Sequence, residues 1–154
     1  RGKEVGEAAE HEEIGCLASI MQWDMAQLGV LTLRTQGTRR FRVLERRVGS
    51  NGLIRADVHP LADDPLISLP DSYAACGQLL RKLVEDLEQR APSPGESMVA
   101  RPYQFDSVAW VANRLCEFLP IPVKARQKLM ELEEPLVRLS LVHQFLQQRH
   151  ALGS

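Results

Sequence analysis

The feature that most constrains this chain is a change in the spacing of its apolar residues at about Leu69. Before this point polar and apolar residues alternate at short range, with glycines between the runs, which is typical of β-strands. After it, apolar residues recur every three or four positions, which is typical of amphipathic helices. The sequence therefore predicts an α+β chain, with a β region over residues 1–67 and a helical region over residues 68–154 that packs on it.

Four short strands are expected in the first region. They cover residues 14–20, 29–36, 40–46 and 53–59. Gly37 is expected to form a hairpin turn between the second and third strands, and residues 50–52 a turn before the fourth. Residues 21–27, which include Trp23, are expected to form a loop or a helix-like stretch. Four such strands would make a twisted antiparallel sheet or an incomplete barrel.

The second region is expected to hold four helices. Asp71 and Asp106 are the expected N-caps of the first two, because a carboxylate accepts from free N–H groups in the first turn. The prolines and glycine of residues 91–95 end the first helix. The last two helices are expected over residues 123–132 and from Pro135 onwards, where proline suits the first helical turn.

Composition excludes several classes of protein. The 19 basic and 20 acidic residues give a formal charge of -1, which does not favour general binding to polyanions. No apolar run approaches the roughly 18 to 20 residues that span a bilayer, and residues 1–13 are charged, so a cytoplasmic protein is expected. The three cysteines, Cys16, Cys76 and Cys116, form no CxxC pair and are expected to be reduced core residues.

Three segments carry a resemblance to a known family. They are GCLASI at residues 15–20, LGVLTL at 28–33 and GTRRFRV at 37–43, and QKLMEL at 127–132 with Pro135 and Arg138 follows later. In order and spacing the chain resembles the LON substrate-binding domain found at the N-terminus of Lon-type proteases. The resemblance implies a PUA-like β pseudobarrel packed against a helical bundle, a fold that engages polypeptide rather than cutting it.

The sequence departs from this family at its start. Family members begin with strands and a helix built around a Pro-Leu-Phe-Pro-Leu type motif, and no segment here corresponds to it. We therefore expect the pseudobarrel to lack its N-terminal strands, which leaves an exposed sheet edge. The phosphate loop GxxxxGK[ST] of an ATPase is also absent from the sequence, so a LON-type domain without ATPase or protease regions is expected.

No motif for catalysis or metal binding stands out. The sequence has no GxSxG elbow and no HExxH pair, and Asp63 and Asp64 are expected to lie in a solvated turn. We therefore predict a protein that is not an enzyme, with no catalytic residue, no metal and no cofactor. Its expected partner is unfolded or extended polypeptide. Binding to a membrane is not expected.

Two tryptophans are the candidate binding residues. Trp110 projects away from the apolar stripe of its predicted helix. Either that helix buries both faces, or Trp110 anchors a peptide or a second subunit. Trp23 leaves the same two interpretations open. An alternative function is RNA binding by the ribbon from Arg39 to Arg47, although strand alternation divides these arginines between two faces.

Overall fold

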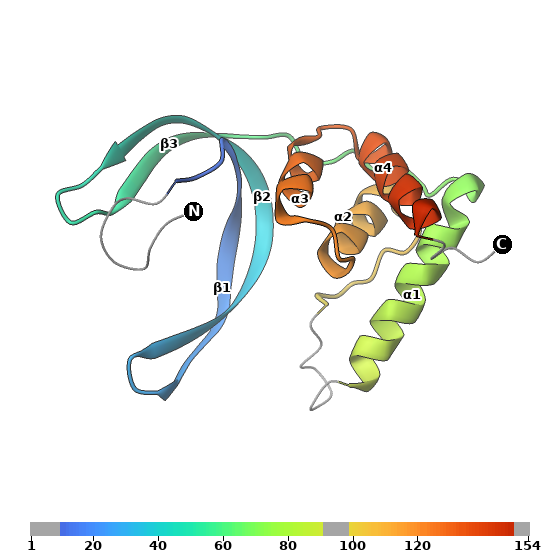
Figure 1. Ribbon diagram of the computed structural model, residues 1–154, viewed down its shortest axis with the longest axis horizontal. Helices are drawn as coiled ribbons and strands as arrows, with labels where there is room; N and C mark the ends of the chain where they lie inside the picture. The colour runs from blue at the N-terminus through green and yellow to red at the C-terminus, as the bar shows by residue number, and fades with distance from the viewer. Residues whose placement is uncertain (1–9, 91–98, 150–154) are drawn as a thin grey trace. The chain divides into compact units, whose positions relative to one another are not determined.

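The computed structural model describes residues 10–90 and 99–149, and the chain divides into two compact units, Arg1–Asp63 and Asp64–Ser154 (Figure 1). The first unit holds a three-stranded antiparallel sheet and the second holds four α-helices, so the predicted α+β class is confirmed. Within the described residues no helix is both long enough and apolar enough to cross a membrane. The expected helix-breaking segment at 91–95 lies outside the described residues.

The sheet unit is built from β1 (Ile14–Gln27), β2 (Val30–Val48) and β3 (Ile54–Pro60), in the order β1-β2-β3. The β1–β2 turn contains Gly29 with φ of 82°, and the β2–β3 turn contains Gly52 with φ of 79°. Glycine adopts this left-handed conformation without the steric penalty of a Cβ. The expected turn at residues 50–52 is therefore confirmed.

The prediction of a hairpin turn at Gly37 is wrong. Gly37 lies inside the continuous strand β2, opposite Ala18 of β1, so the second and third expected strands are one. A Cβ at Gly37 would lie 3.3 Å from Sγ of Cys16, so the glycine permits a close approach between strands rather than a turn. Residues 21–27 are likewise part of strand β1 and not a loop.

The helical unit begins with a 3-10 turn, η1 (Asp71–Tyr73), followed by α1 (Ala74–Gln89), α2 (Val108–Phe118), α3 (Val123–Glu131) and α4 (Pro135–Gln148). The expected starts of the last two helices are confirmed. The two predicted caps are wrong: Asp71 lies in the 3-10 turn, which has no side-chain cap. At α2 the cap is Ser107, whose Oγ accepts from the Trp110 N–H at 3.4 Å.

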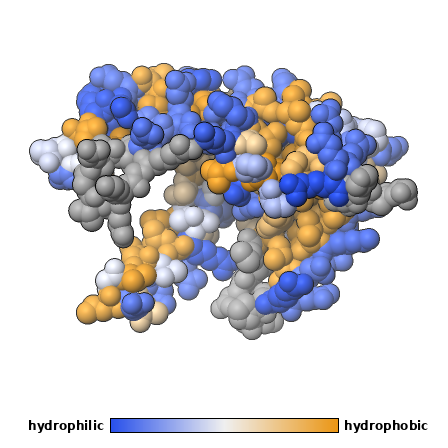
Figure 2. Space-filling view, viewed as in Figure 1, coloured by the Kyte–Doolittle hydropathy of each residue, from blue (hydrophilic) through white to orange (hydrophobic). Residues whose placement is uncertain are grey.

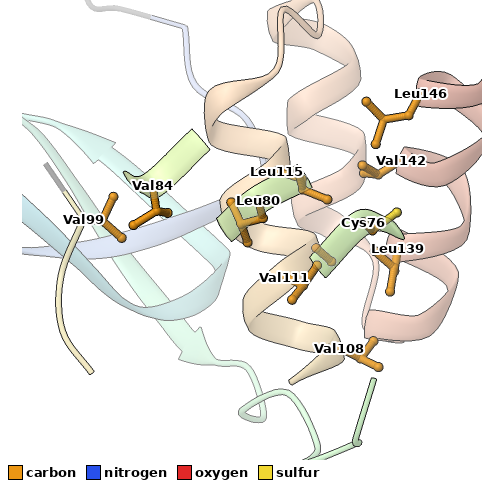
Figure 3. Close-up of a cluster of buried hydrophobic side chains, with 11 residues drawn as sticks. Cys76, Leu80, Val84, Val99, Val108, Val111, Leu115, Leu139, Val142 and Leu146 are labelled. Atoms are coloured by element: carbon orange, nitrogen blue, oxygen red, sulfur yellow. The ribbon is translucent and has the colours of Figure 1, made fainter. Parts of the chain in front are cut away.

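The helical unit has an apolar core of its own (Figure 3). Its fully buried side chains come from α1, α2, α4 and the segment before α2: Cys76, Leu80, Val84, Val99, Val108, Val111, Ala112, Leu115, Leu139, Val142 and Leu146. In the described part of the sheet unit, residues 10–63, Ile14 is the only buried apolar side chain. The two units therefore differ sharply in how much apolar surface they bury.

A buried arginine forms hydrogen bonds to several parts of the helical unit. Arg138 on α4 is 2% exposed, and its Nη1 donates to Asp64 Oδ2 at 2.9 Å and to Asn113 Oδ1 at 3.0 Å. Its Nε and Nη2 donate to the carbonyls of Leu129 and Leu132 at the end of α3, at 3.0 and 2.6 Å. A buried charge is tolerated when it is paired and hydrogen-bonded in this way.

The two aspartates before Pro65 have different environments. Asp63 is exposed, as predicted, and pairs with Arg39 at 3.1 Å, but it lies in an extended connection rather than in a turn. The same expectation is wrong for Asp64, whose side chain is only 13% exposed because it pairs with buried Arg138.

The three cysteines are free, but they are not all core residues. Cys76 is buried and Cys116 is partly buried, and desolvation raises the pKa of each thiol to about 11. Cys16 is exposed on β1, so the prediction that it belongs to the core is wrong. Within residues 10–63 the sheet forms a single layer, so Cys16 has no second layer there to pack against.

Candidate binding site on the β1–β2 hairpin

The hairpin of β1 and β2 exposes many large apolar side chains. With exposed fractions between 45% and 95%, they are Leu17, Ile20, Met21, Trp23, Met25, Leu28, Val30, Leu31 and Leu33. Figure 2 shows apolar atoms gathered where Figure 1 places the end of this hairpin. Contiguous exposed apolar surface on a protein commonly marks an interaction site.

Strand register sorts the hairpin side chains onto two faces. Antiparallel partners share a face, and successive residues of a regular strand alternate between faces. One face carries Ala18 with Gly37, Ile20 with Thr35, Trp23 with Leu33, and Leu31 further along β2. The opposite face carries Ser19 with Gln36, Gln22 with Arg34, and Asp24 with Thr32. We call the first of these the apolar face, defined by Ile20, Trp23, Leu31 and Leu33.

Trp23 stands near the middle of the apolar face. Its side chain is 68% exposed, and its cross-strand partner Leu33 is 45% exposed. The nearest charged residues of the hairpin, Asp24 and Arg34, belong to the opposite face. The apolar face is therefore a ridge of aromatic and aliphatic surface without a charge of its own.

Trp110 is half-buried within the helical unit. Its ring lies 5.0 Å from that of Phe105, edge to face, and 6.1 Å from that of Tyr103. These aromatic residues precede α2 and give Trp110 its second contact, so α2 has packing partners on this side as well as in the core. A role for Trp110 as a binding anchor stays a prediction.

The arginines from Arg39 to Arg47 do not form one basic surface. Two of them are paired with carboxylates: Arg39 with Asp63 at 3.1 Å, and Arg47 with Asp57 at 2.7 Å. In addition, Arg46 and Arg47 are consecutive residues in regular pairing with β3, so their side chains point to opposite sides of the sheet. Carboxylates thus neutralise two of these arginines, and alternation disperses the ribbon.

Two observations on the described residues bear on metal binding and catalysis. Across residues 10–90 and 99–149 no three or more His, Cys, Asp or Glu side chains are grouped to hold a metal ion. An open hollow of about 910 Å³ lies beside the β2–β3 turn, lined by Arg47, Ser50, Arg55 and Asp57 among others. Its lining places no histidine beside Ser50, so it offers no nucleophile with a base.

Of the residues on the apolar face, sequence reasoning singled out only Trp23. Ile20, Leu31 and Leu33 were expected in strands, but without knowledge of the pairing their common face was not apparent. The sequence signal for this common face was the alternation of apolar and polar residues over 30–36, which puts Leu31 and Leu33 on one side of the strand. The pairing of Arg138 with Asp64 was not predicted, because the two residues are 74 positions apart in the sequence.

The fold and this site define an α+β domain with an exposed apolar sheet face, and comparison with known proteins supplies its family. The family model of the ATP-dependent protease La (LON) substrate-binding domain matches residues 2–148. The chain therefore belongs to the LON substrate-binding domain family. No curated protein matches the sequence significantly.

Two Lon N-terminal domains are among the solved structures that resemble the chain. A Lon N-terminal domain protein from Xanthomonas campestris matches with a TM-score of 0.68 and 29% identity, covering 85% of this chain and 66% of its own. The N-terminal domain of a Mycobacterium avium complex Lon protease matches with a TM-score of 0.53 and 17% identity, covering 92% of this chain and 71% of its own. The second match supports the fold alone. The chain thus spans just under two thirds of the Xanthomonas structure.

Proposed function

We propose that this chain binds extended, apolar segments of unfolded polypeptide through the apolar face of the β1–β2 hairpin, and that it is not itself an enzyme. The single observation that carries the proposal is the exposure of the cross-strand pair Trp23 and Leu33 on the apolar face, beside Ile20 and Leu31. Membership of a substrate-binding domain family supports it.

The chemistry of the face selects one kind of ligand. Each Å² of apolar surface removed from water contributes about 25 cal/mol, so apolar side chains of the ligand would supply most of the affinity. Unfolded polypeptides expose such side chains, whereas folded proteins bury most of them. Ordering a flexible segment opposes this gain, so binding is expected to be weak and sensitive to each large apolar contact.

The alternative of RNA binding has less support. RNA recognition requires basic groups that are available to phosphate, often with aromatic residues that stack on bases. Arg39 and Arg47 are held by carboxylates, and the residues nearest Trp23 on its face, Ile20, Leu31 and Leu33, are apolar rather than basic. The cytoplasmic location expected from the sequence stays a prediction.

The proposal is tested by fluorescence anisotropy with a labelled unfolded probe, reduced and carboxymethylated α-lactalbumin. Trp23→Ser should weaken binding at least about tenfold, because a central tryptophan commonly contributes 2 kcal/mol or more to an interface. Thr32→Ser, on the opposite face of the same hairpin, is the matched control and should bind like the unaltered protein. Equal affinity of both variants, or no saturable binding by the unaltered protein, would refute the proposal.

A further inference from the structure

Two methionines lie where β1 departs from regular pairing with β2. Met21 lies at the register shift between Ile20 and Gln22, where β1 uses one residue more than β2. Met25 lies at the next shift along the strand. Both side chains are exposed, at 61% and 48%. Met21 follows Ile20 directly and Met25 is two residues beyond Trp23, so both exposed thioethers adjoin residues of the apolar face in sequence.

In the described sheet β1 is an edge strand, so its outer edge is the obvious place for a ligand to add a fourth strand. The register argues against this mode of binding. Its three shifts divide β1 into regular runs of three residues, Ile14–Cys16, Ala18–Ile20 and Gln22–Asp24. A typical strand is about five or six residues long, and bulges interrupt the ladder that an incoming strand would follow.

Hydrogen bonds at the irregular places reinforce this argument. The backbone N–H of Met25 donates to the Asp24 carboxylate at 2.7 Å. The carbonyl of Leu17, at another shift, accepts from the Thr38 hydroxyl at 3.2 Å. These main-chain groups already have partners within the hairpin, so they offer little to a fourth strand.

We infer that ligands bind here by side-chain contact without strand addition, and that Met21 and Met25 determine how many different apolar sequences the site accepts. Methionine is unbranched, polarizable and adaptable, and it is frequent on surfaces that bind many partners. Two such side chains beside rigid Trp23 would let the face adjust to leucine, phenylalanine or valine in the ligand. This inference rests on the proposed function and specifies its mode of recognition.

The absence of strand addition is tested with fluorescein-labelled peptides as long as β1, 14 residues, in which apolar and threonine residues alternate. One peptide carries N-methyl groups on every odd residue and another on every even residue. Both modifications restrict the peptide similarly, but only one would remove the N–H groups that pair with β1. We expect the two to bind within about threefold of each other, whereas a difference above about tenfold would overturn the inference.

The role of the methionines is tested with Met21→Ile and Met25→Ile together, which retain apolar character but stiffen both side chains. Leu44→Ile, an exposed position on β2 beyond this face, is the control. Across leucine-rich, phenylalanine-rich and valine-rich peptides, the double variant should widen the spread of dissociation constants by about fivefold, and the control should not. An unchanged spread would overturn the role of the methionines.

The outcomes separate this inference from the proposed function. If the unaltered protein binds none of the peptides, the proposed function itself fails. If it binds them and Trp23→Ser weakens binding, but one N-methyl pattern abolishes it, the function stands and strand addition is its mode.

Discussion

The helical unit and the sheet unit of this chain place their apolar residues in opposite ways. In the helical unit α1, α2 and α4 turn leucine and valine side chains inward, and eleven residues form a fully buried cluster. In the described sheet unit only Ile14 is buried, while Trp23, Leu33 and their neighbours lie exposed on one face of a hairpin. The same residue types therefore form the core of one unit and lie exposed in the other.

The two units also differ in how deeply they bury an Arg–Asp ion pair. Each unit holds an Arg–Asp pair with consecutive aspartates, Arg39 with Asp63 and Arg138 with Asp64. The first is more than half exposed on both sides, whereas the second is almost fully enclosed. Burial, rather than distance, is the main difference between them.

The largest expected effect tests the contrast between the buried and the exposed Arg–Asp pair. Arg138→Met should lower the free energy of unfolding by about 3–5 kcal/mol, because it leaves the Asp64 carboxylate without its buried partner. Arg39→Met, its exposed counterpart, should change it by less than about 1 kcal/mol. Urea unfolding followed by circular dichroism measures both. Similar losses for the two variants would mean that the buried pair has no special role.

The next largest effect concerns the apolar residues. Leu115→Ala in the helical core should lower the free energy of unfolding by about 2–5 kcal/mol, because it removes buried methyl groups and leaves a cavity. Leu33→Ala on the hairpin should cost much less, about 1 kcal/mol or below, since 45% of the residue is exposed and the substitution leaves no enclosed cavity. The same urea experiment compares the matched pair. A loss at Leu33 as large as that at Leu115 would show that the hairpin face is a core and not a binding surface.

The sequence predicted the helical unit better than the sheet. Helical spacing and proline locate α3 and α4 correctly, because a helix is determined by residues close together in sequence. Gly37 was misinterpreted because a glycine that allows strands to approach and a glycine in a turn look alike without the pairing. The cap at α2 was misplaced by one residue, a local choice between Asp106 and Ser107.

The candidate site was predicted only in part. Trp23 was identified, but its face depends on the register with Leu33, which is a property of pairing rather than of composition. The Arg138–Asp64 pair depends on tertiary folding, which brings α4 to the segment before η1. Likewise, Trp110 needed a second contact, yet only the structure identifies Tyr103 and Phe105 as the residues that provide it.

The most direct test of the central claim follows the emission of Trp23 itself. In a Trp110→Phe variant, shown to be folded by circular dichroism, Trp23 is the only tryptophan. Before ligand is added, its emission should be that of a tryptophan in water, because the side chain is 68% exposed. Titration with an unlabelled 14-residue peptide of alternating leucine and threonine, which contains no tryptophan, should shift the emission to shorter wavelength and saturate as the ring leaves water. Saturable binding by anisotropy without any shift in Trp23 emission would contradict the assignment of the site to this face.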